Sequence, residues 1–405
     1  MRILLIHQAF AAIDEPGGTR HYEFAQYFAS HGHQITIVTT PINYLTGKEQ
    51  NQGGVERIQV GMGEIVIWRR RVYGAFHRSF VHRTISFISF MLTSFWAAMK
   101  VEQPDLIWGT SPPIFQGVTA WAVSRLRRKP FLLEIRDLWP AFAVQVGVLR
   151  NPILIRLSEW LERFLIQRAD TVVVNSPGFM DHVRQRGAKK IECVPNGADV
   201  NLFEAKKDGN AFRRKYGLEG KFVVLYAGAH GMSNDLGTLL RSAQLVQSQK
   251  EIVFVLVGDG KEKPALMQQA EQMGLKNVLF LPPIAKTEIS NVFQAADACV
   301  ALLKPIPLYG TVYPNKVFDY MAAGKPVILA IAGVIKQVVE EEKAGIAVPP
   351  GDAPAMAAAV LQLAGNPMLA AECGQNGRRA ILERFDRQKL ANQFERLLLK
   401  MVEKD

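Results

Sequence analysis

The chain has 405 residues, of which 48% are hydrophobic and 21% charged, and its formal net charge is +11. This composition excludes a disordered protein, and the length exceeds what one hydrophobic core ordinarily serves, so we expect two domains. The excess of positive charge lies mainly in the first half: residues 1–200 hold 23 Lys and Arg against 16 Asp and Glu, and residues 201–405 hold 25 against 21. Because no recognised nucleic-acid-binding module accompanies it, we expect no nucleic-acid partner.

The cysteines and the apolar segments indicate in which cellular compartment the protein works. Cys193, Cys299 and Cys373 are far apart and form no CxxC pair, which argues against a disulfide or metal framework and fits a reducing compartment. The first residues, MRILLIH, predict a strand and not a signal peptide. The longest uncharged stretch, residues 84–99, has 16 residues and contains Ser and Thr, so it is too short to span a bilayer. We therefore expect a cytoplasmic protein.

Short apolar runs alternate with amphipathic segments through both halves. In the first half, strands are predicted at residues 3–7, 34–39, 59–66, 106–108, 131–135, 171–174 and 191–194, and helices at 19–31, 79–100, 115–127, 152–168 and 177–186. The pattern restarts with strands at 222–227, 252–257, 278–281, 298–302 and 327–329 and helices at 235–247, 264–273, 289–295 and 316–322. Strands that alternate with helices indicate parallel sheets, because parallel neighbours need long crossovers.

This pattern predicts an α/β protein with two Rossmann-like, doubly wound domains, over residues 1–198 and 199–386, joined by the polar stretch 199–220. Residues 387–405 predict an amphipathic helix that could pack back toward the first domain. Its apolar face holds Leu390, Phe394, Leu397, Leu398 and Met401. Ligands of such sheets bind beyond the carboxyl ends of the strands, so the loops that follow strands are the candidates for function.

Two loops of the first half carry turn residues. Gly17 and Gly18 precede a predicted helix, where backbone N–H groups and the helix dipole favour an anion. The alternative is a flexible turn with Thr19 as the N-cap. Asn196 and Gly197 form a strong turn signal after the last strand of that half, which suits a hinge whose loop also touches ligand.

Polar residues follow two other apolar strands. Arg136 and Asp137 come after the strand at 131–135 and are expected to point toward ligand; the alternative is an ion pair that steadies the loop. Gly228, His230 and Gly231 come after the strand at 222–227. There the imidazole could lie beside a phosphate, whereas a lone histidine is more often structural.

The most informative stretch is YPNKVFDYMAAGKPVI, residues 313–328. Pro314 can begin a helix that the sequence GKP ends, and Lys316 and Asp319 lie one turn apart on it. The loop before this helix delivers backbone N–H groups and a carboxylate to the carboxyl edge of the sheet, where a carboxylate can accept two ribose hydroxyls. The alternative is a surface pair of Lys316 and Asp319, which would contribute a few tenths of a kcal/mol.

Together these motifs resemble the retaining glycosyltransferases of the GT-B fold, family four, over essentially the whole chain. The early glycine pair, PNGAD at 195–199, YAG at 226–228, GDG at 258–260 and PNKVFDYMAAGKPVI at 314–328 have the family's order and spacing. The motifs GGTRHYEFA, RDLWP and AGAHG are similar to those of the bacterial branch of the family that builds cell-surface polysaccharides, including amino-sugar transferases. The resemblance implies two Rossmann-like domains that face each other across a cleft.

The resemblance also implies roles for single residues. The family's signature has two glutamates separated by seven residues, and Asp319 stands at the second, ribose-binding position. Thr311 stands at the first, donor-sugar position, which is not an acid here. Many members hold the diphosphate with an Arg and a Lys, and those positions are Ala229 and Asp235 in this chain. His230, Lys316 and the two glycine loops are the candidates to replace them.

The resemblance places Arg136 and Asp137 where the family has an acceptor-side histidine. The candidate site is therefore Arg136, Asp137, His230 and Lys316 as catalytic residues, Gly17, Gly18, Asn196, Gly228, Gly231, Thr311, Tyr313, Pro314, Asn315 and Asp319 around the donor, and Arg20 on the acceptor side.

The implied reaction is retaining transfer of a sugar, of the N-acetylhexosamine type and from a UDP donor, to a lipid-linked saccharide. It would take place at the inner face of the bacterial cytoplasmic membrane. The chain contains no Asp-x-Asp sequence, so we expect no metal and no cofactor, with the leaving charge neutralised by helix N-termini and basic side chains. The alternatives are a nucleotide-sugar epimerase of the same fold and a non-catalytic nucleotide-sugar-binding subunit.

A basic segment of the first half suggests where a membrane would bind. Arg69, Arg70, Arg71, Arg78 and Arg83 are interleaved with Tyr73, Phe76 and Phe80 and precede the uncharged stretch. We expect residues 69–99 to dock on an anionic membrane surface. The alternative is an ordinary helix packed on the sheet with solvated arginines.

Overall fold

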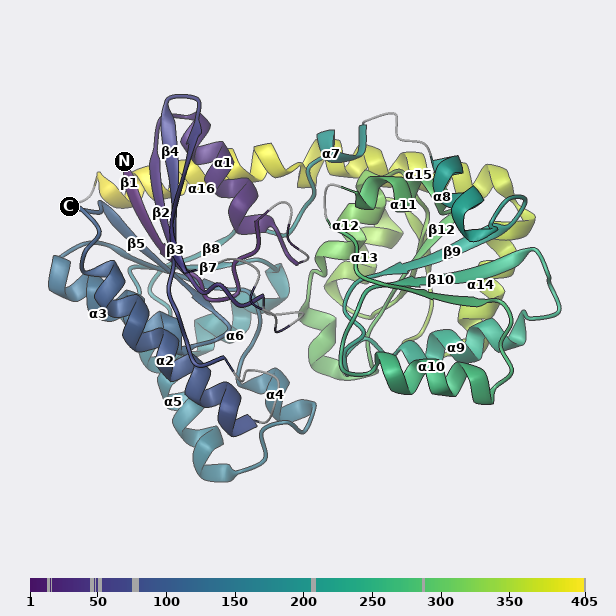
Figure 1. The fold of residues 1–405 in the computed structure, drawn as a ribbon, viewed down its shortest axis with the longest axis horizontal. Helices are drawn as coiled ribbons and strands as arrows, with labels where there is room; N and C mark the ends of the chain where they lie inside the picture. Colours follow the sequence, from purple (N-terminus) through teal and green to yellow (C-terminus); the bar gives the residue numbers. More distant parts are fainter. Residues whose placement is uncertain are drawn as a thin grey trace. The chain divides into compact units, whose positions relative to one another are not determined.

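The computed structural model describes residues 1–403 apart from 13, 14, 16, 44–46, 48, 50–52, 75–79, 205–208, 286 and 287. The chain divides into two compact units, one of Met1–Pro195 with Gln388–Asp405 and the other of Asn196–Arg387. Each unit has one sheet of mainly parallel strands with helices packed on it (Figure 1). The architecture of two parallel-sheet α/β domains predicted from the alternating pattern is confirmed.

The first unit contains an eight-stranded sheet in the order β3-β4-β2-β1-β5-β6-β7-β8. Its strands are β1 (Arg2–Ile6), β2 (Gln34–Thr39), β3 (Gly54–Val60), β4 (Gly63–Arg69), β5 (Leu106–Ser111), β6 (Phe131–Ile135), β7 (Thr171–Val174) and β8 (Ile191–Cys193). Its helices are α1 (Arg20–Ser30), α2 (Phe80–Ala98), α3 (Phe115–Arg127), α4 (Ala141–Gln145), α5 (Pro152–Arg168), the short η1 (Pro177–Phe179), α6 (Met180–Gln185) and α16 (Arg387–Val402). None of the helices in the described ranges is long and apolar enough to cross a membrane.

The edge of this sheet corrects two expectations. In place of one strand at 59–66, the chain forms the antiparallel hairpin β3–β4, which turns at Gly61, where φ is +56°. At the end of β4, Arg69 is buried and donates to Glu56 at 2.5 Å and to Glu15 at 3.4 Å. Its guanidinium is therefore used within the protein and cannot contact a membrane as we expected. Phe76 and Arg78, from the same basic segment, lie outside the described residues.

The second unit contains a six-stranded parallel sheet in the order β11-β10-β9-β12-β13-β14. Its strands are β9 (Phe222–Ala227), β10 (Ile252–Val257), β11 (Val278–Leu281), β12 (Ala298–Leu302), β13 (Val327–Ala330) and β14 (Gly345–Ala347). Its helices are α7 (Asn201–Glu204), α8 (Gly209–Tyr216), α9 (Leu236–Leu245), α10 (Lys263–Gln272), α11 (Ile289–Ala295), the short η2 (Pro307–Thr311), α12 (Asn315–Ala322), α13 (Val334–Glu341), α14 (Ala353–Gly365), α15 (Pro367–Ala380) and the π-helical turn η3 (Ile381–Phe385).

Helix α16 completes the core of the first unit, although it follows the whole second unit in sequence. The ring of Phe394 lies 4.9 Å from that of Trp108, 5.4 Å from that of Phe24 and 5.9 Å from that of Phe28. All four side chains are buried, so α16 covers the sheet between α1 and β5. The helix also makes a polar contact with the first unit, since Nε2 of His33 lies 2.8 Å from a carboxylate oxygen of Glu395.

We expect Phe394→Ala to lower the free energy of unfolding of the first unit by about 3–5 kcal/mol, because the truncated ring leaves a cavity beside Trp108. Denaturant unfolding followed by tryptophan fluorescence measures the change. Leu399→Ala on the same helix is the matched control, since Leu399 is 37% exposed. Equal midpoints for Phe394→Ala and the control would contradict a core role for α16.

Candidate functional site

Two glycine loops meet at the carboxyl edge of the second unit's sheet. The loop after β9 holds Gly228 and Gly231, and the loop after β10 holds Gly258 and Gly260. A Cβ built on Gly258 would lie 1.9 Å from the carbonyl oxygen of Gly228, and one on Gly260 would lie 2.5 Å from that of His230. The loops therefore pack backbone against backbone, an approach that only glycine permits.

Lys316 reaches from α12 to the first of these loops. Its Nζ donates to the hydroxyl of Tyr226 at 2.8 Å and to Oδ1 of Asn234 at 3.2 Å, and lies 4.1 Å from the centroid of the Tyr226 ring. A Cβ on Gly228 would lie 3.1 Å from the same nitrogen. The ammonium is thus directed at the glycine loop, and the surface pair of Lys316 with Asp319 is not how this side chain is used.

The environment of Lys316 favours a bound anion. Burial lowers the pKa of its ammonium from 10.5 to about 7. Its two hydrogen-bond acceptors, the hydroxyl of Tyr226 and the amide oxygen of Asn234, are neutral, and within the described residues no carboxylate forms an ion pair with it. An anionic group at the glycine loop would stabilise the charged form, and a diphosphate supplies that charge together with acceptors for the loop's N–H groups.

The loop after β9 also holds His230, a predicted cation of the site. Its side chain is fully buried, and neither ring nitrogen has a hydrogen-bond partner in the described part of the chain. Burial first, then Lys263 and Lys316, lower its pKa to about 4, so the imidazole is neutral at pH 7. In the protein without a ligand the imidazole is therefore a neutral hydrogen-bond donor, and its role as a cation beside a phosphate stays a prediction.

The loop before α12 is held by the start of the second unit. Asn196 donates through Nδ2 to the carbonyl oxygen of Tyr313 at 2.7 Å, and Thr311 donates to the carbonyl oxygen of Leu308 at 2.7 Å. Pro314 is the N-cap of α12 in extended conformation, so the helix begins at Asn315. Three predicted donor-site residues, Tyr313, Pro314 and Asn315, are thus consecutive at the start of α12, and the side chain of Asn196 is bonded to the first of them.

Asp319 lies one turn into α12 from Lys316 and is half-buried. The helix thus carries both a cation aimed at the glycine loop and a carboxylate on neighbouring turns. Within one element this arrangement offers a group for a phosphate and a group for hydroxyls, which are the two polar parts of a nucleotide.

A buried polar network lies at the carboxyl edge of the first unit's sheet. The Nδ1 atom of His7 is hydrogen-bonded to the hydroxyl of Thr110 at 3.0 Å, and Gln116 donates to the same hydroxyl at 2.6 Å. The Nε2 atom of His7 is buried and has no partner among the described residues. Burial lowers the pKa of His7 well below its usual value. The sequence predicted a strand that ends at His7, but we assigned this residue no role in the site. The sequence feature that could have identified it is its position as the first polar residue after an apolar strand.

Arg20 is used inside the first unit. It donates to Glu134 at 3.1 Å and to the carbonyl oxygens of Pro195 at 2.7 Å and Val194 at 2.6 Å. Burial raises the pKa of Glu134, but His21 and Arg20 outweigh it and hold this pKa at about 2. The expectation that Arg20 contacts the acceptor is therefore corrected: it ties the loop after β8 to β6 and is a positioning residue.

The pair that follows β6, Arg136 and Asp137, lies at the carboxyl edge of the first unit's sheet. Arg136 donates to the carbonyl oxygen of Pro112 at 2.6 Å, and its own carbonyl accepts from Asn175 at 3.2 Å. Burial raises the pKa of Asp137 to about 7, against the opposing effect of Arg136. A carboxyl group that titrates near neutral pH can exchange a proton with a hydroxyl group.

The predicted residues thus form two groups, one at the carboxyl edge of each sheet. The first unit places Arg136 and Asp137 after β6, and Gly17 and Gly18 before α1, with φ of +152° at Gly17. In the second unit, the loop after β9 holds Gly228, His230 and Gly231, and the segment from η2 into α12 holds Thr311, Tyr313, Pro314, Asn315, Lys316 and Asp319. Lys316 reaches the glycine loop, and Asn196 is bonded to Tyr313. Across the described ranges, no cluster of three His, Cys, Asp or Glu side chains is placed to hold a metal ion.

Two family models match the chain. Residues 17–197 match a "Glycosyl transferase 4-like domain", and residues 221–366 match "Glycosyl transferases group 1". A relative named as a colanic acid biosynthesis glycosyl transferase, WcaI of Escherichia coli, is 24% identical over 75% of this chain and 76% of its own length. Alignments to two further curated glycosyltransferases span 54% and 58% of those proteins.

Solved structures resemble the fold over the full length. Sucrose-phosphate synthase from Thermosynechococcus elongatus has a TM-score of 0.81 at 20% identity, covering 100% of both chains. HepE of Anabaena, in complex with UDP and glucose, has a TM-score of 0.74 at 20% identity, covering 99% of this chain and 100% of its own. At this level of identity the likeness supports the fold.

We expect a uridine diphosphate to bind with uptake of a proton, because the anion favours the charged form of Lys316. Above pH 7, where the unliganded lysine is neutral, the affinity should fall about tenfold for each pH unit. Calorimetry at pH 6.5, 7.5 and 8.5 in buffers of different ionisation enthalpy measures the slope. Lys316→Met should remove the slope and Lys276→Met, at an exposed and remote lysine, should keep it. A wild-type affinity that does not vary with pH would refute this role for Lys316.

Proposed function

Because the chain belongs to the GT-B glycosyltransferases of family four, we propose that it is a retaining enzyme of bacterial surface-polysaccharide synthesis. Its donor is a uridine diphosphate sugar of the N-acetylhexosamine type, and its acceptor is a lipid-linked saccharide. The observation that carries the proposal is the half-buried ammonium of Lys316, which is aimed at a glycine loop and shares a helix with Asp319.

The names of related proteins support the substrates proposed. WcaI carries the name of a colanic acid biosynthesis glycosyl transferase, and HepE binds UDP and glucose in its solved structure. The name of WcaI supports a role in polysaccharide assembly, and the HepE complex supports a uridine diphosphate donor. The preference for an N-acetylated sugar rests on the resemblance of the motifs GGTRHYEFA and AGAHG to those of amino-sugar transferases.

In the mechanism that we propose, Lys316 and the N–H groups of the glycine loops stabilise the charge that develops on the leaving diphosphate. His230 donates a hydrogen bond to it as a neutral imidazole, and Asp319 accepts the ribose hydroxyls. The leaving phosphate assists deprotonation of the acceptor hydroxyl on the same face of the sugar, so no enzyme nucleophile is assigned. Arg136 and Asp137 bind the acceptor, and the near-neutral pKa of Asp137 suits a contact with a hydroxyl group.

We also propose that the first unit works at an anionic membrane surface, at the inner face of the cytoplasmic membrane, through residues 69–99. With Arg69 buried, the basic contribution comes from its neighbours, of which Arg71 is exposed. The apolar contribution comes from α2, where the side chains of Val81 and Trp96 are 64% and 67% exposed. Tryptophan side chains such as that of Trp96 are enriched at the interface of a bilayer.

A thermal-shift screen of nucleotide-sugars tests the donor. We expect UDP-N-acetylhexosamines to raise the melting temperature most, because a ligand that binds the native state stabilises it. Asp319→Ala should weaken binding about tenfold or more, since a charge-assisted hydrogen bond contributes about 1.5–3 kcal/mol. Asp319→Glu, which restores the family's residue, is the control and should retain binding. A clear preference for GDP-sugars would defeat the UDP assignment, and epimerised free donor without transfer would identify an epimerase.

Sugar transfer should persist in the presence of EDTA, because Lys316 and the glycine loops are placed to neutralise the leaving group. Initial rates with and without chelator should agree within about twofold. For comparison, removal of a single hydrogen-bond donor that stabilises a transition state lowers kcat by about a hundredfold or more. The matched variant is Lys316→Met, whose rate should fall sharply under both conditions. Loss of activity in EDTA that added magnesium or manganese restores would overturn this account of the leaving group.

A further inference from the structure

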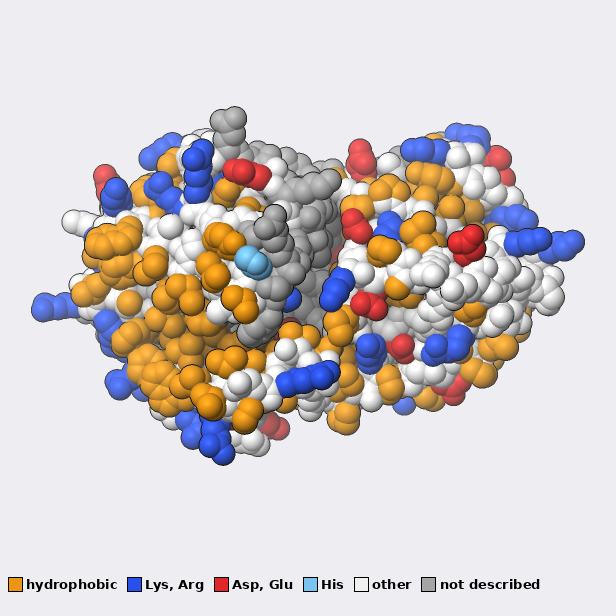
Figure 2. Space-filling model, turned by 60° about the horizontal axis from the view of Figure 1, so that its bottom comes forward, with side chains coloured by type: hydrophobic (Ala, Val, Ile, Leu, Met, Phe, Trp, Pro, Cys, Tyr) orange, Lys and Arg blue, Asp and Glu red, His pale blue; other side chains and the backbone are white. Residues whose placement is uncertain are grey.

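Three helices of the first unit form an unusual outward surface. Helices α2, α3 and α5 pack side by side, α3 in the middle, on one face of the sheet. Ten large apolar side chains on them are exposed: Val81, Ile85, Ile88, Leu92 and Trp96 on α2, Leu126 on α3, and Ile153, Leu154, Leu157 and Trp160 on α5. Figure 2 shows hydrophobic side chains gathered over this face, with Lys and Arg at its margins.

Scattered exposed apolar residues are normal, but a contiguous patch marks an interaction site. In the second unit the exposed large hydrophobics lie singly on separate elements, for example Met267 on α10 and Met368 on α15. On α5, by contrast, Ile153, Leu157 and Trp160 recur at helical spacing along one side, 67%, 56% and 61% exposed. The apolar face of the three helices is therefore a specific feature of the first unit.

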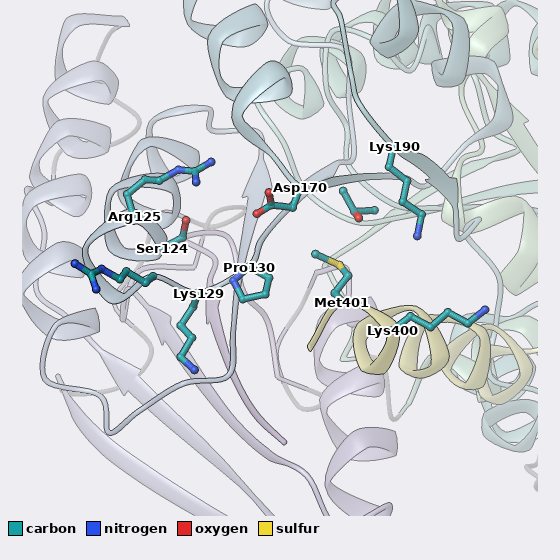
Figure 3. A pocket seen from close by; sticks show the side chains of 10 residues that line it. Ser124, Arg125, Lys129, Pro130, Asp170, Lys190, Lys400 and Met401 are labelled. Carbon is teal, nitrogen blue, oxygen red and sulfur yellow. The ribbon is translucent and has the colours of Figure 1, made fainter. Parts of the chain in front are cut away.

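A basic pocket lies at the C-terminal end of one of these helices, α3. It has a volume of about 480 Å³ and lies where α3 and α16 end and β6 and β7 begin (Figure 3). Five cationic residues line it: Arg125, Arg128, Lys129, Lys190 and Lys400. The one carboxylate in its lining, that of Asp170, accepts the backbone N–H of Phe131 at 2.8 Å. The hydroxyl of Ser124, also in the lining, is buried and has no hydrogen-bond partner among the described residues.

Helix dipoles explain only part of this charge. Arg125 is in the last turn of α3 and Lys400 in the last turn of α16, where a cation contributes about 0.3–1 kcal/mol. Lys129 directly follows Arg128, the C-cap of α3, and its backbone N–H donates to the carbonyl oxygen of Ser124 at 2.9 Å. Lys190 instead lies in the loop that precedes β8. Four of the five cations thus lie at the C-terminal ends of α3 and α16, and Lys190 adds a fifth from a separate loop, so that two helix ends and a strand loop direct positive charge into one pocket.

A chain of contacts joins the pocket to the apolar face. Arg125 donates to the carbonyl oxygen of Arg168 at 3.0 Å, and the guanidinium of Arg168 lies 5.5 Å from the ring of Phe164. The ring of Phe164 lies 4.9 Å from that of Trp121 and 5.6 Å from that of Trp160. A cationic pocket and an aromatic, apolar helix side are therefore parts of one continuous surface.

We propose that this surface is a binding site for a membrane phospholipid with an anionic headgroup. The phosphate lies in the basic pocket, where Arg and Lys donate charge-assisted hydrogen bonds, and the acyl chains lie against α5. This rests on the proposed function, since an enzyme with a lipid-linked acceptor works at a bilayer. It goes beyond docking by residues 69–99, because it assigns lipid selectivity to α3 and α16 and apolar binding to α5.

Co-sedimentation with vesicles of phosphatidylglycerol and of phosphatidylcholine separates the two parts. The pocket variant Arg128→Ser/Lys129→Ser/Lys400→Ser should lose at least tenfold in binding to phosphatidylglycerol and should no longer discriminate between the vesicles. The matched control, Lys250→Ser/Lys276→Ser/Lys336→Ser, removes the same charge from exposed positions of the second unit and should bind as wild type. Leu157→Ser/Trp160→Ser should lose binding to both vesicles, whereas Leu361→Ser/Met368→Ser should not.

Transfer to a water-soluble acceptor analogue keeps this inference separate from the proposed function, and all four variants should retain it. The inference fails if the pocket variant binds and discriminates as wild type does. It also fails if the pocket binds inorganic diphosphate while wild type ignores vesicles, or if sedimentation analysis shows that α5 instead pairs two copies of the chain. Loss of transfer to the soluble analogue by the control variants as well would count against the variants' folding, which circular dichroism of each variant checks beforehand.

Discussion

Parallel strand pairing decides where chemistry can occur in this protein. In a parallel sheet all carboxyl ends meet at one edge, so loops far apart in sequence become neighbours there. In the second unit this edge joins the loops after β9 and β10, and α12 places Lys316 beside them. In the first unit it joins His7, Thr110 and Arg136, which follow or end three different strands. Helices on the faces provide the burial that changes the pKa values of these side chains.

The buried charges at the carboxyl edges of the two sheets are compensated to different degrees. In the first unit, Glu134 is bonded to both Arg20 and His21, so the buried charges compensate one another without a ligand. In the second unit, Lys316 is surrounded by neutral hydrogen-bond partners, and the cost of burying its charge appears as a lowered pKa. An unpaired buried charge is costly unless a partner arrives. This difference is the reason why we propose that the anion binds in the second unit and not in the first.

The sequence alone predicted the two parallel sheets well, because hydrophobic periodicity is a local property that does not depend on partners. It missed the β3–β4 hairpin, where apolar alternation runs on across the turn at Gly61. It pointed to the expected donor loop through PNKVFDYMAAGKP, which stays a prediction, and it could not give the direction of the side chains there. That His230 would be neutral, and that Arg20 would be enclosed by Glu134 and two carbonyl groups, depends on tertiary burial and long-range contacts. Tyr226 and Asn234 were missed for the same reason, since neither is distinctive until Lys316 reaches them.

The return of α16 to the first unit has a consequence for how the chain is made. During translation, domains generally fold as units in the order in which they emerge from the ribosome, at about 5–20 residues per second. Here the first unit lacks the helix that carries Phe394 until the entire second unit has been synthesised, a delay of about 10–40 s at that rate. Through that interval the apolar side of the sheet around Trp108 stays uncovered, while residues 196–387 can already fold. The unit that begins first is thus the one completed last, which makes its exposed sheet a natural substrate for chaperones on the nascent chain.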